Sequence, residues 1–145
     1  MPPGLGRWVS DHHDYVWARM PFVVPMAAAV ARRRNDAMAQ ELADTLRLLY
    51  ASLVAHLDRE ERFFARSGRA NAVEWVGADL HADHMMVGSM LDRIRQLATS
   101  LLAKHESSSP LERGLYAELA CLDAHLSTQM ELEELIVIDQ LEGRP

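Results

Sequence analysis

Apolar residues recur at helical spacing along nearly all of this 145-residue chain, and this periodicity limits the possible fold more than any other feature. Glycine and proline are scarce, with 7 and 6 residues, while Ala, Leu, Arg, Glu and Met form long stretches that favour helix. Hydrophobic residues make up 49% of the chain, which is enough for one continuous core in a domain of this size. The sequence therefore predicts a single all-α domain spanning residues 1–145.

Local turn signals divide the chain into four predicted helices, at approximately residues 10–33, 37–66, 72–105 and 111–141. Ser10 and Asp11 are expected to cap the first helix, and Pro21 and Pro25 are expected to bend it. The three connections are predicted at Asn35-Asp36, at Ser67-Gly68 and at the Ser-Ser-Ser-Pro run that ends at Pro110.

The last three predicted helices carry apolar residues at the spacing of a buried face. Because the connections are short, neighbouring helices are expected to be antiparallel, which predicts an up-down four-helix bundle. The apolar residues in question are Leu42, Leu46, Leu49, Leu53 and Phe63, then Leu80, Met90, Leu91, Ile94 and Leu97, then Leu115, Leu119, Leu122, Leu126, Leu132, Leu135 and Ile136.

The charge balance and the single cysteine argue against several classes of function. With 21 acidic and 15 basic residues the net charge is -6, which disfavours nucleic acid or an anionic membrane surface as the main partner. The sequence has no stretch of about twenty apolar residues that would span a bilayer. Cys121 is the single cysteine and has no partner for an intramolecular disulfide, so we expect the protein in the cytoplasm. We expect the side chain of Cys121 to pack in the core.

Histidines and carboxylates recur at helical spacing in the predicted helices. His56 and Glu60 are four residues apart and project from one face, and Gln129 and Glu133 repeat this spacing one turn after His125. Helices seldom bury such groups unless they pair or bind a metal, because each unsatisfied buried group costs about 1 to 3 kcal/mol. A single pair of this kind is more often an ordinary position on a solvated face.

The up-down topology is a reason to consider these residues together. In such a bundle the start of the first helix, the end of the second, the start of the third and the end of the fourth meet. Imidazole and carboxylate donors without a thiolate suit iron, manganese or zinc, and two bridging carboxylates suit two metals about 3.5 to 4 Å apart. We therefore predict a dinuclear site. The candidate ligands at those four places are His13, His56 with Glu60, His84, and Glu133.

These residues lie in motifs that resemble the hemerythrin-like (HHE cation-binding) domain, most closely its di-iron "repair of iron centres" family. The resemblance covers nearly the whole chain. The family's first helix has a His followed eight residues later by a proline, similar to His13 and Pro21. Its second helix has His-x-x-x-Glu-Glu before an apolar pair, similar to the run from His56 to Phe64.

The third and fourth helices continue the resemblance with two replacements. The family has Glu-His with a glycine four residues later on its third helix, and this chain has Asp83-His84 with the same glycine. The last helix of the family reads Leu-x-x-His-x-x-Leu-Glu, and the best match is the run from Leu126 to Glu133. Gln129 stands there in place of a ligand histidine.

The resemblance implies that Glu60 and Glu133 bridge two irons. The amide oxygen of Gln129 is a neutral and weaker donor than imidazole, so we expect one iron to be held less firmly. His125 is the alternative, about 6 Å away along the helix axis. The full ligand set that the resemblance implies is His13, His56, Glu60, His84, Gln129 and Glu133.

The remaining histidines, His12, His81 and His105, are not predicted as metal ligands. The oxygen-carrier branch of the superfamily needs two histidines four apart on the third helix, and neither Leu80 nor Gly88 supplies the second. His81 is a candidate for orienting a ligand, although we expect it, like His12 and His105, to be an ordinary exposed residue.

The resemblance implies a protein that binds or reacts with nitric oxide, dioxygen or peroxide, in a nitrosative or oxidative stress response or in iron-centre repair. A redox or iron–sulfur protein is the partner that such a role would require. Repair proteins often carry a cysteine pair in a small domain ahead of the bundle. This sequence has a single cysteine, so we expect any thiol-dependent step to come from elsewhere. Two alternatives stay open: a metal-labile sensor or iron-binding protein without turnover, and a degenerate metal-free bundle that serves as an interaction module.

Overall fold

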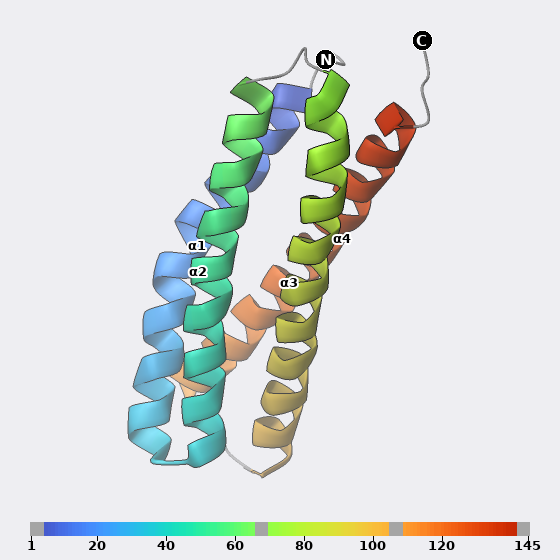
Figure 1. The fold of residues 1–145 in the computed structure, drawn as a ribbon. Helices are drawn as coiled ribbons and strands as arrows, with labels where there is room; N and C mark the ends of the chain where they lie inside the picture. Colours follow the sequence, from blue (N-terminus) through green and yellow to red (C-terminus); the bar gives the residue numbers. More distant parts are fainter. Residues whose placement is uncertain (1–4, 66–69, 105–108, 142–145) are drawn as a thin grey trace.

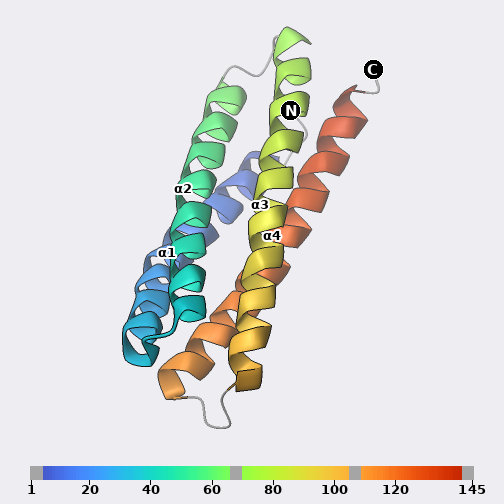
Figure 2. The same cartoon turned by 60° about the horizontal axis from the view of Figure 1, so that its bottom comes forward.

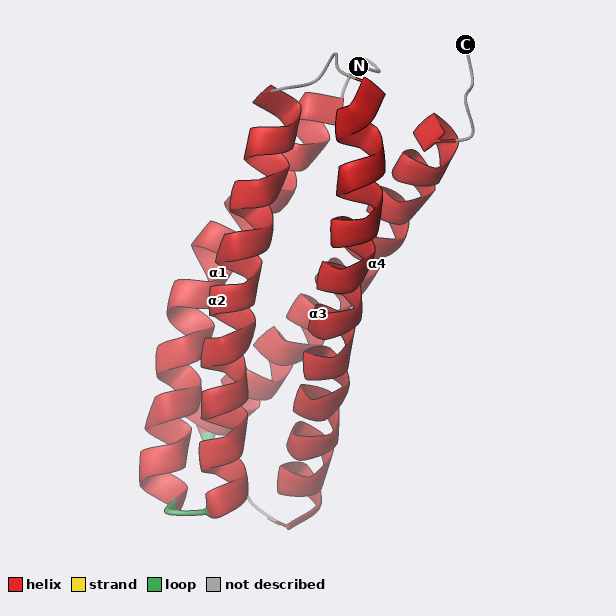
Figure 3. Cartoon of the chain, in the orientation of Figure 1, coloured by secondary structure: helices red, strands yellow, loops and turns green. Residues whose placement is uncertain are grey.

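Four helices make up nearly all of the described residues, and no strand occurs among them (Figures 1 and 3). The structure is a computed structural model that describes residues 5–65, 70–104 and 109–141, with side chains described for 11–60, 62, 80–104 and 109–135. The prediction of an all-helical chain is confirmed. The helices are α1 (Leu5–Arg34), α2 (Ala37–Ala65), α3 (Ala70–Lys104) and α4 (Pro110–Leu141).

Consecutive helices run in opposite directions and form a four-helix bundle (Figures 1 and 2). α1 packs on α2, α2 on α3 and α3 on α4, and α4 also contacts α1. The start of α1, the end of α2, the start of α3 and the end of α4 therefore lie at one end of the molecule. Within the described ranges, none of these helices has the length and apolar character needed to cross a bilayer.

The first helix begins earlier than predicted. α1 starts at Leu5, so Ser10 and Asp11 lie inside the helix and the caps predicted there are wrong. An N-cap side chain favours a helix start without imposing one, and no proline lies between Leu5 and Ser10 to interrupt the helix. Pro21 and Pro25 lie inside α1, which changes direction along its length (Figure 2), because each proline removes a backbone donor.

The first connection is a tight turn with matching capping groups. Asn35 has φ of 50°, a left-handed conformation that asparagine tolerates, and its N–H donates to the carbonyl oxygen of Ala31 at 3.0 Å. The carboxylate of Asp36 accepts from the N–H of Met38 at 2.7 Å and caps α2. The turn predicted at Asn35-Asp36 is confirmed, whereas the connection predicted at Ser67-Gly68 lies outside the described residues.

Leucines from α2, α3 and α4 form most of the buried core, together with valines and Met20 of α1. Leu132 and Leu135 continue the apolar spacing of α4 but are 40% and 63% exposed, because Glu133 takes the inward position at that level. Cys121 is exposed, so its predicted core position is wrong; it precedes the inward-facing Leu122 on the helix. Of the predicted core residues, Met90 is half-buried, Phe63 and Ile136 have side chains outside the described set, and the buried ones are Leu42, Leu46, Leu49, Leu53, Leu80, Leu91, Ile94, Leu97, Leu115, Leu119, Leu122 and Leu126.

Arg34 connects α1 to α4 at the end of the bundle where α1 ends and α4 begins. Its guanidinium donates to the carboxylate of Glu112 at 3.3 Å and to the hydroxyl of Tyr116 at 3.0 Å. It also donates to the backbone carbonyl of Leu101 at 3.4 Å. This end of the bundle is therefore held by a paired buried charge, and the opposite end carries the histidines.

The core predicts a clear contrast between two leucines of α2. Leu46 is fully buried and Leu48 is 64% exposed. We expect Leu46→Ala to lower the free energy of unfolding by about 2 to 5 kcal/mol, because it removes buried methyl groups and leaves a cavity. Leu48→Ala should change it by less than about 0.5 kcal/mol. Urea unfolding followed by circular dichroism measures both, and equal losses would contradict a buried Leu46 and an exposed Leu48.

Candidate metal centre

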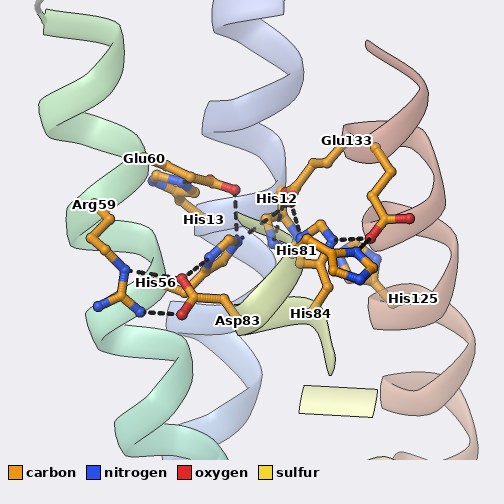
Figure 4. Close-up of polar contacts among 11 residues, drawn as sticks. His12, His13, His56, Arg59, Glu60, His81, Asp83, His84, His125 and Glu133 are labelled. Atoms are coloured by element: carbon orange, nitrogen blue, oxygen red, sulfur yellow. Dashed lines mark hydrogen bonds and ion pairs between the residues drawn. The ribbon is translucent and has the colours of Figure 1, made fainter. Parts of the chain in front are cut away.

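Six titratable side chains are buried together at the end of the bundle where α1 begins and α4 ends (Figures 1 and 4). All four helices contribute, as the topology predicted. A buried polar group without a partner costs about 1 to 3 kcal/mol, so these side chains must satisfy one another or bind a ligand. They are His12 and His13 of α1, His56 and Glu60 of α2, His84 of α3 and Glu133 of α4, all between 3% and 8% exposed.

Glu60 lies between two histidines from different helices. Its Oε1 is 2.8 Å from Nε2 of His56, which precedes it by one turn on α2. Its Oε2 is 2.8 Å from Nε2 of His13, which comes from α1. Each oxygen of this carboxylate therefore meets a different ring nitrogen.

Glu133 repeats this arrangement from α4. Its Oε2 is 2.7 Å from Nε2 of His84 and 3.4 Å from Nε2 of His56. Its Oε1 faces the other way, toward Nε2 of His12 at 3.8 Å. His56, His84 and Glu133 each offer a ligand atom within 4.8 Å of the others, and this buried group could hold a metal ion.

Asp83 orients His56 from the neighbouring helix α3. The Nδ1–H of His56 donates to Oδ2 of Asp83 at 3.1 Å, and Arg59 donates to both oxygens of Asp83 at 2.9 and 2.5 Å. Burial lowers the pKa of His56, but its hydrogen bonds with Glu133 and Glu60 raise it more, to about 11. His56 is therefore an imidazolium near neutral pH, and both of its ring nitrogens donate.

The two buried carboxylates have pKa values shifted in opposite directions. Burial raises the pKa of Glu60, but the hydrogen bonds from His13 and His56 lower this pKa by a larger amount, so the net shift is downward. The pKa of Glu133 is raised by its burial, and the charge of Glu60 adds to this shift. Two like charges in a low-dielectric environment disfavour each other, and cations held between them would remove that penalty.

His12 is buried, and the expectation that it is exposed is wrong. Its Nδ1 lies 3.2 Å from Nε2 of His125, whose ring stacks on Tyr15 with centroids 3.6 Å apart. Burial lowers the pKa of His12 to about 4, so this ring is neutral near pH 7. Helical spacing in the sequence did not predict the burial of His12. Adjacent residues on a helix point about 100° apart, and His13 already occupied the predicted inward position.

Gln129 has a buried side-chain oxygen that accepts no hydrogen bond from any described residue. It lies one turn before Glu133 on α4, and a buried acceptor of this kind is suited to a cation. His81 is exposed, as expected, and its Nδ1 is 3.3 Å from Oε1 of Glu134. The same oxygen is 3.2 Å from Nδ1 of His84, so Glu134 supports His84 from outside the cluster. His105 lies outside the described residues.

Comparison of the chain with protein-family models, with curated proteins and with solved structures gives no match. Of the six residues predicted as ligands, five form one network of contacts, and Gln129 places an unpartnered oxygen on the same helix. Their role as ligands remains a prediction. The five are His13, His56, Glu60, His84 and Glu133.

The raised pKa of His56 predicts how the stability of the metal-free protein depends on pH. The ring titrates near 6.5 when unfolded and near 11 when folded, so its stabilising effect is complete below pH 6.5 and is lost as the pH rises toward 11. The loss of stability caused by His56→Gln should therefore shrink between pH 6.5 and pH 11, by up to about 1.4 kcal/mol per pH unit.

Urea unfolding of chelator-treated protein at pH 6 and pH 9 measures this effect. The exposed His81→Gln is the matched control and should show a small difference at both pH values. A destabilisation by His56→Gln that is the same at pH 6 and pH 9 would contradict the ion pairing of His56.

Proposed function

We propose that this chain is a hemerythrin-like, non-haem di-iron protein that binds or reacts with nitric oxide, dioxygen or peroxide. The observation that carries the proposal is the position of the two carboxylates. Glu60 and Glu133 each direct one oxygen toward a histidine of α1 and the other toward histidines of α2 or α3. Two carboxylates that each contact two groups of histidines could bridge a pair of metal ions.

The donor types in the cluster support this choice of metal. All are imidazole nitrogens or carboxylate and amide oxygens, a set that suits iron, manganese or zinc, and the likeness of the motifs to the repair family selects iron. Gln129, one turn before Glu133 on α4, buries an oxygen that accepts no hydrogen bond from a described residue, and a cation bound near it would supply a partner. Iron in such a site supplies redox chemistry and open coordination positions for a small ligand.

The surrounding residues set the properties of the site. Asp83 and Glu134 hold Nδ1 of His56 and of His84, so the Nε2 atoms of both rings point inward. The buried leucine core continues along the bundle from the site. Because the ligand side chains are themselves almost completely buried, a small diatomic molecule or peroxide fits better than a bulky substrate.

A metal-labile sensor or iron-binding protein is the second candidate function. The observation that favours it is that the histidines and carboxylates already satisfy one another, with contacts of 2.7 and 2.8 Å. These contacts partly compensate the buried charges without a metal, so metal release would not require unfolding. Slow loss of iron with turnover of nitric oxide or peroxide would favour an enzyme, and rapid exchange without turnover would favour a sensor.

Glu60→Ala tests the dinuclear site. We expect wild-type protein from iron-supplemented anaerobic culture to contain about two irons per chain, and the variant to lose at least one, because Glu60 contacts histidines on both sides. Elemental analysis measures the content, and the optical spectrum before and after nitric oxide tests for ligand binding.

The exposed Glu131→Ala on α4 is the matched control and should keep the wild-type metal content. Wild-type protein that takes up no metal under these conditions would overturn the proposal and favour the metal-free interaction module.

Gln129→His tests whether Gln129 faces the site. Imidazole binds iron more firmly than an amide oxygen, so this variant should retain more iron than wild type after dialysis against a weak chelator. Thr128→His, which adds a histidine at the adjacent exposed position, should show no gain. Equal iron retention in all three proteins would show that position 129 does not contribute a ligand.

A further inference from the structure

The ring of His12 lies between two side chains of α4 that flank Gln129 in the sequence. Nδ1 of His12 contacts His125, one turn before Gln129, and Nε2 of His12 faces Glu133, one turn after it. The ring therefore spans the level of α4 at which Gln129 buries its unpartnered oxygen. Figure 4 shows His12 directed from α1 toward α4, between His125 and Glu133.

His12 and His13 both contribute to the α1 side of the cluster. Nε2 of His13 is 2.8 Å from Oε2 of Glu60, and Nε2 of His12 is 3.8 Å from Oε1 of Glu133. Their ring centroids are 6.1 Å apart with planes inclined by 61°. The two oxygens that are turned away from His56 and His84 thus each face a histidine of α1.

The contact with His125 leaves the other nitrogen of His12 available. If Nδ1–H of His12 donates to Nε2 of His125, the lone pair on Nε2 of His12 points toward the carboxylate of Glu133. Metal-binding histidines commonly have this arrangement, with one ring nitrogen on the metal and the other donating to an outer partner. Tyr15 stacks on His125 and fixes that partner in turn.

We propose that His12 is a ligand of a second metal position on the α1 side of Glu60 and Glu133, shared with His13 and Gln129. This inference rests on the proposed dinuclear site and specifies how its α1 half is built. His12 supplies the nitrogen donor that Gln129 does not, from a different helix. His125 acts as a positioning residue that holds the ring of His12.

Anaerobic titration of metal-free protein with iron(II) alone tests the proposal, with bound iron per chain measured after equilibrium dialysis. Wild type should bind two ions. His12→Ala should bind one ion with unchanged affinity and the second more than about 10-fold more weakly. His12→Phe preserves a ring of similar size without nitrogen donors, so it should give the same result even where the alanine variant folds poorly.

Three further variants separate ligation from packing. Asp11→Ala removes an exposed polar group next to His12 and should bind two ions like wild type. The double variant with His12→Ala and Gln129→His supplies a histidine from α4 instead and should recover the second ion. His125→Ala should weaken only the second ion, by about 10- to 100-fold, as loss of an outer hydrogen-bond partner does.

The outcomes distinguish this inference from the proposed function. Two ions bound by wild type and equally tightly by His12→Phe would overturn the role of His12 while leaving the di-iron protein intact. One ion in wild type, unaffected by His12→Phe, would overturn the second position. No bound iron in wild type would overturn both proposals.

Discussion

The burial of charged and polar side chains at one end of the bundle is the constraint on which the rest of the structure depends. Six histidines and glutamates are almost fully removed from water there, and each is acceptable only because the others, or a cation, satisfy it. Since the partners come from four different helices, the network requires all four to be aligned along their axes. A shift of one helix by a single turn, about 5.4 Å, would separate the carboxylates from their histidines.

The buried charges at the two ends of the bundle are compensated by different interactions. Arg34 and Glu112 form a pair with Tyr116 at one end, and this pair joins α1 to α4 as a structural tie. At the other end the histidines are linked through shared carboxylates. The buried amide oxygen of Gln129 accepts no hydrogen bond from a described residue. Between them the leucine core supplies the hydrophobic stabilisation.

α1 contributes two buried histidines to the candidate site, whereas the sequence pattern predicted one. Two prolines bend this helix, and both His12 and His13 are buried in the N-terminal half, against α4 and α2 respectively. A straight helix directs adjacent residues to different sides, so both can be buried only where the helix lies in a groove between two neighbours. α1 contacts both α2 and α4, which provides that groove.

The sequence by itself determined the helices, most of the leucine core and the five-residue contact network, because apolar spacing, turn chemistry and up-down topology are local or follow from short connections. Only the tertiary structure decided that His12 is buried, that Asp83 and Arg59 orient His56, and that Cys121 is exposed. These features depend on the rotation and tilt of each helix against its neighbours. Helical periodicity gives the relative directions of side chains on one helix, but packing between helices selects which direction points inward.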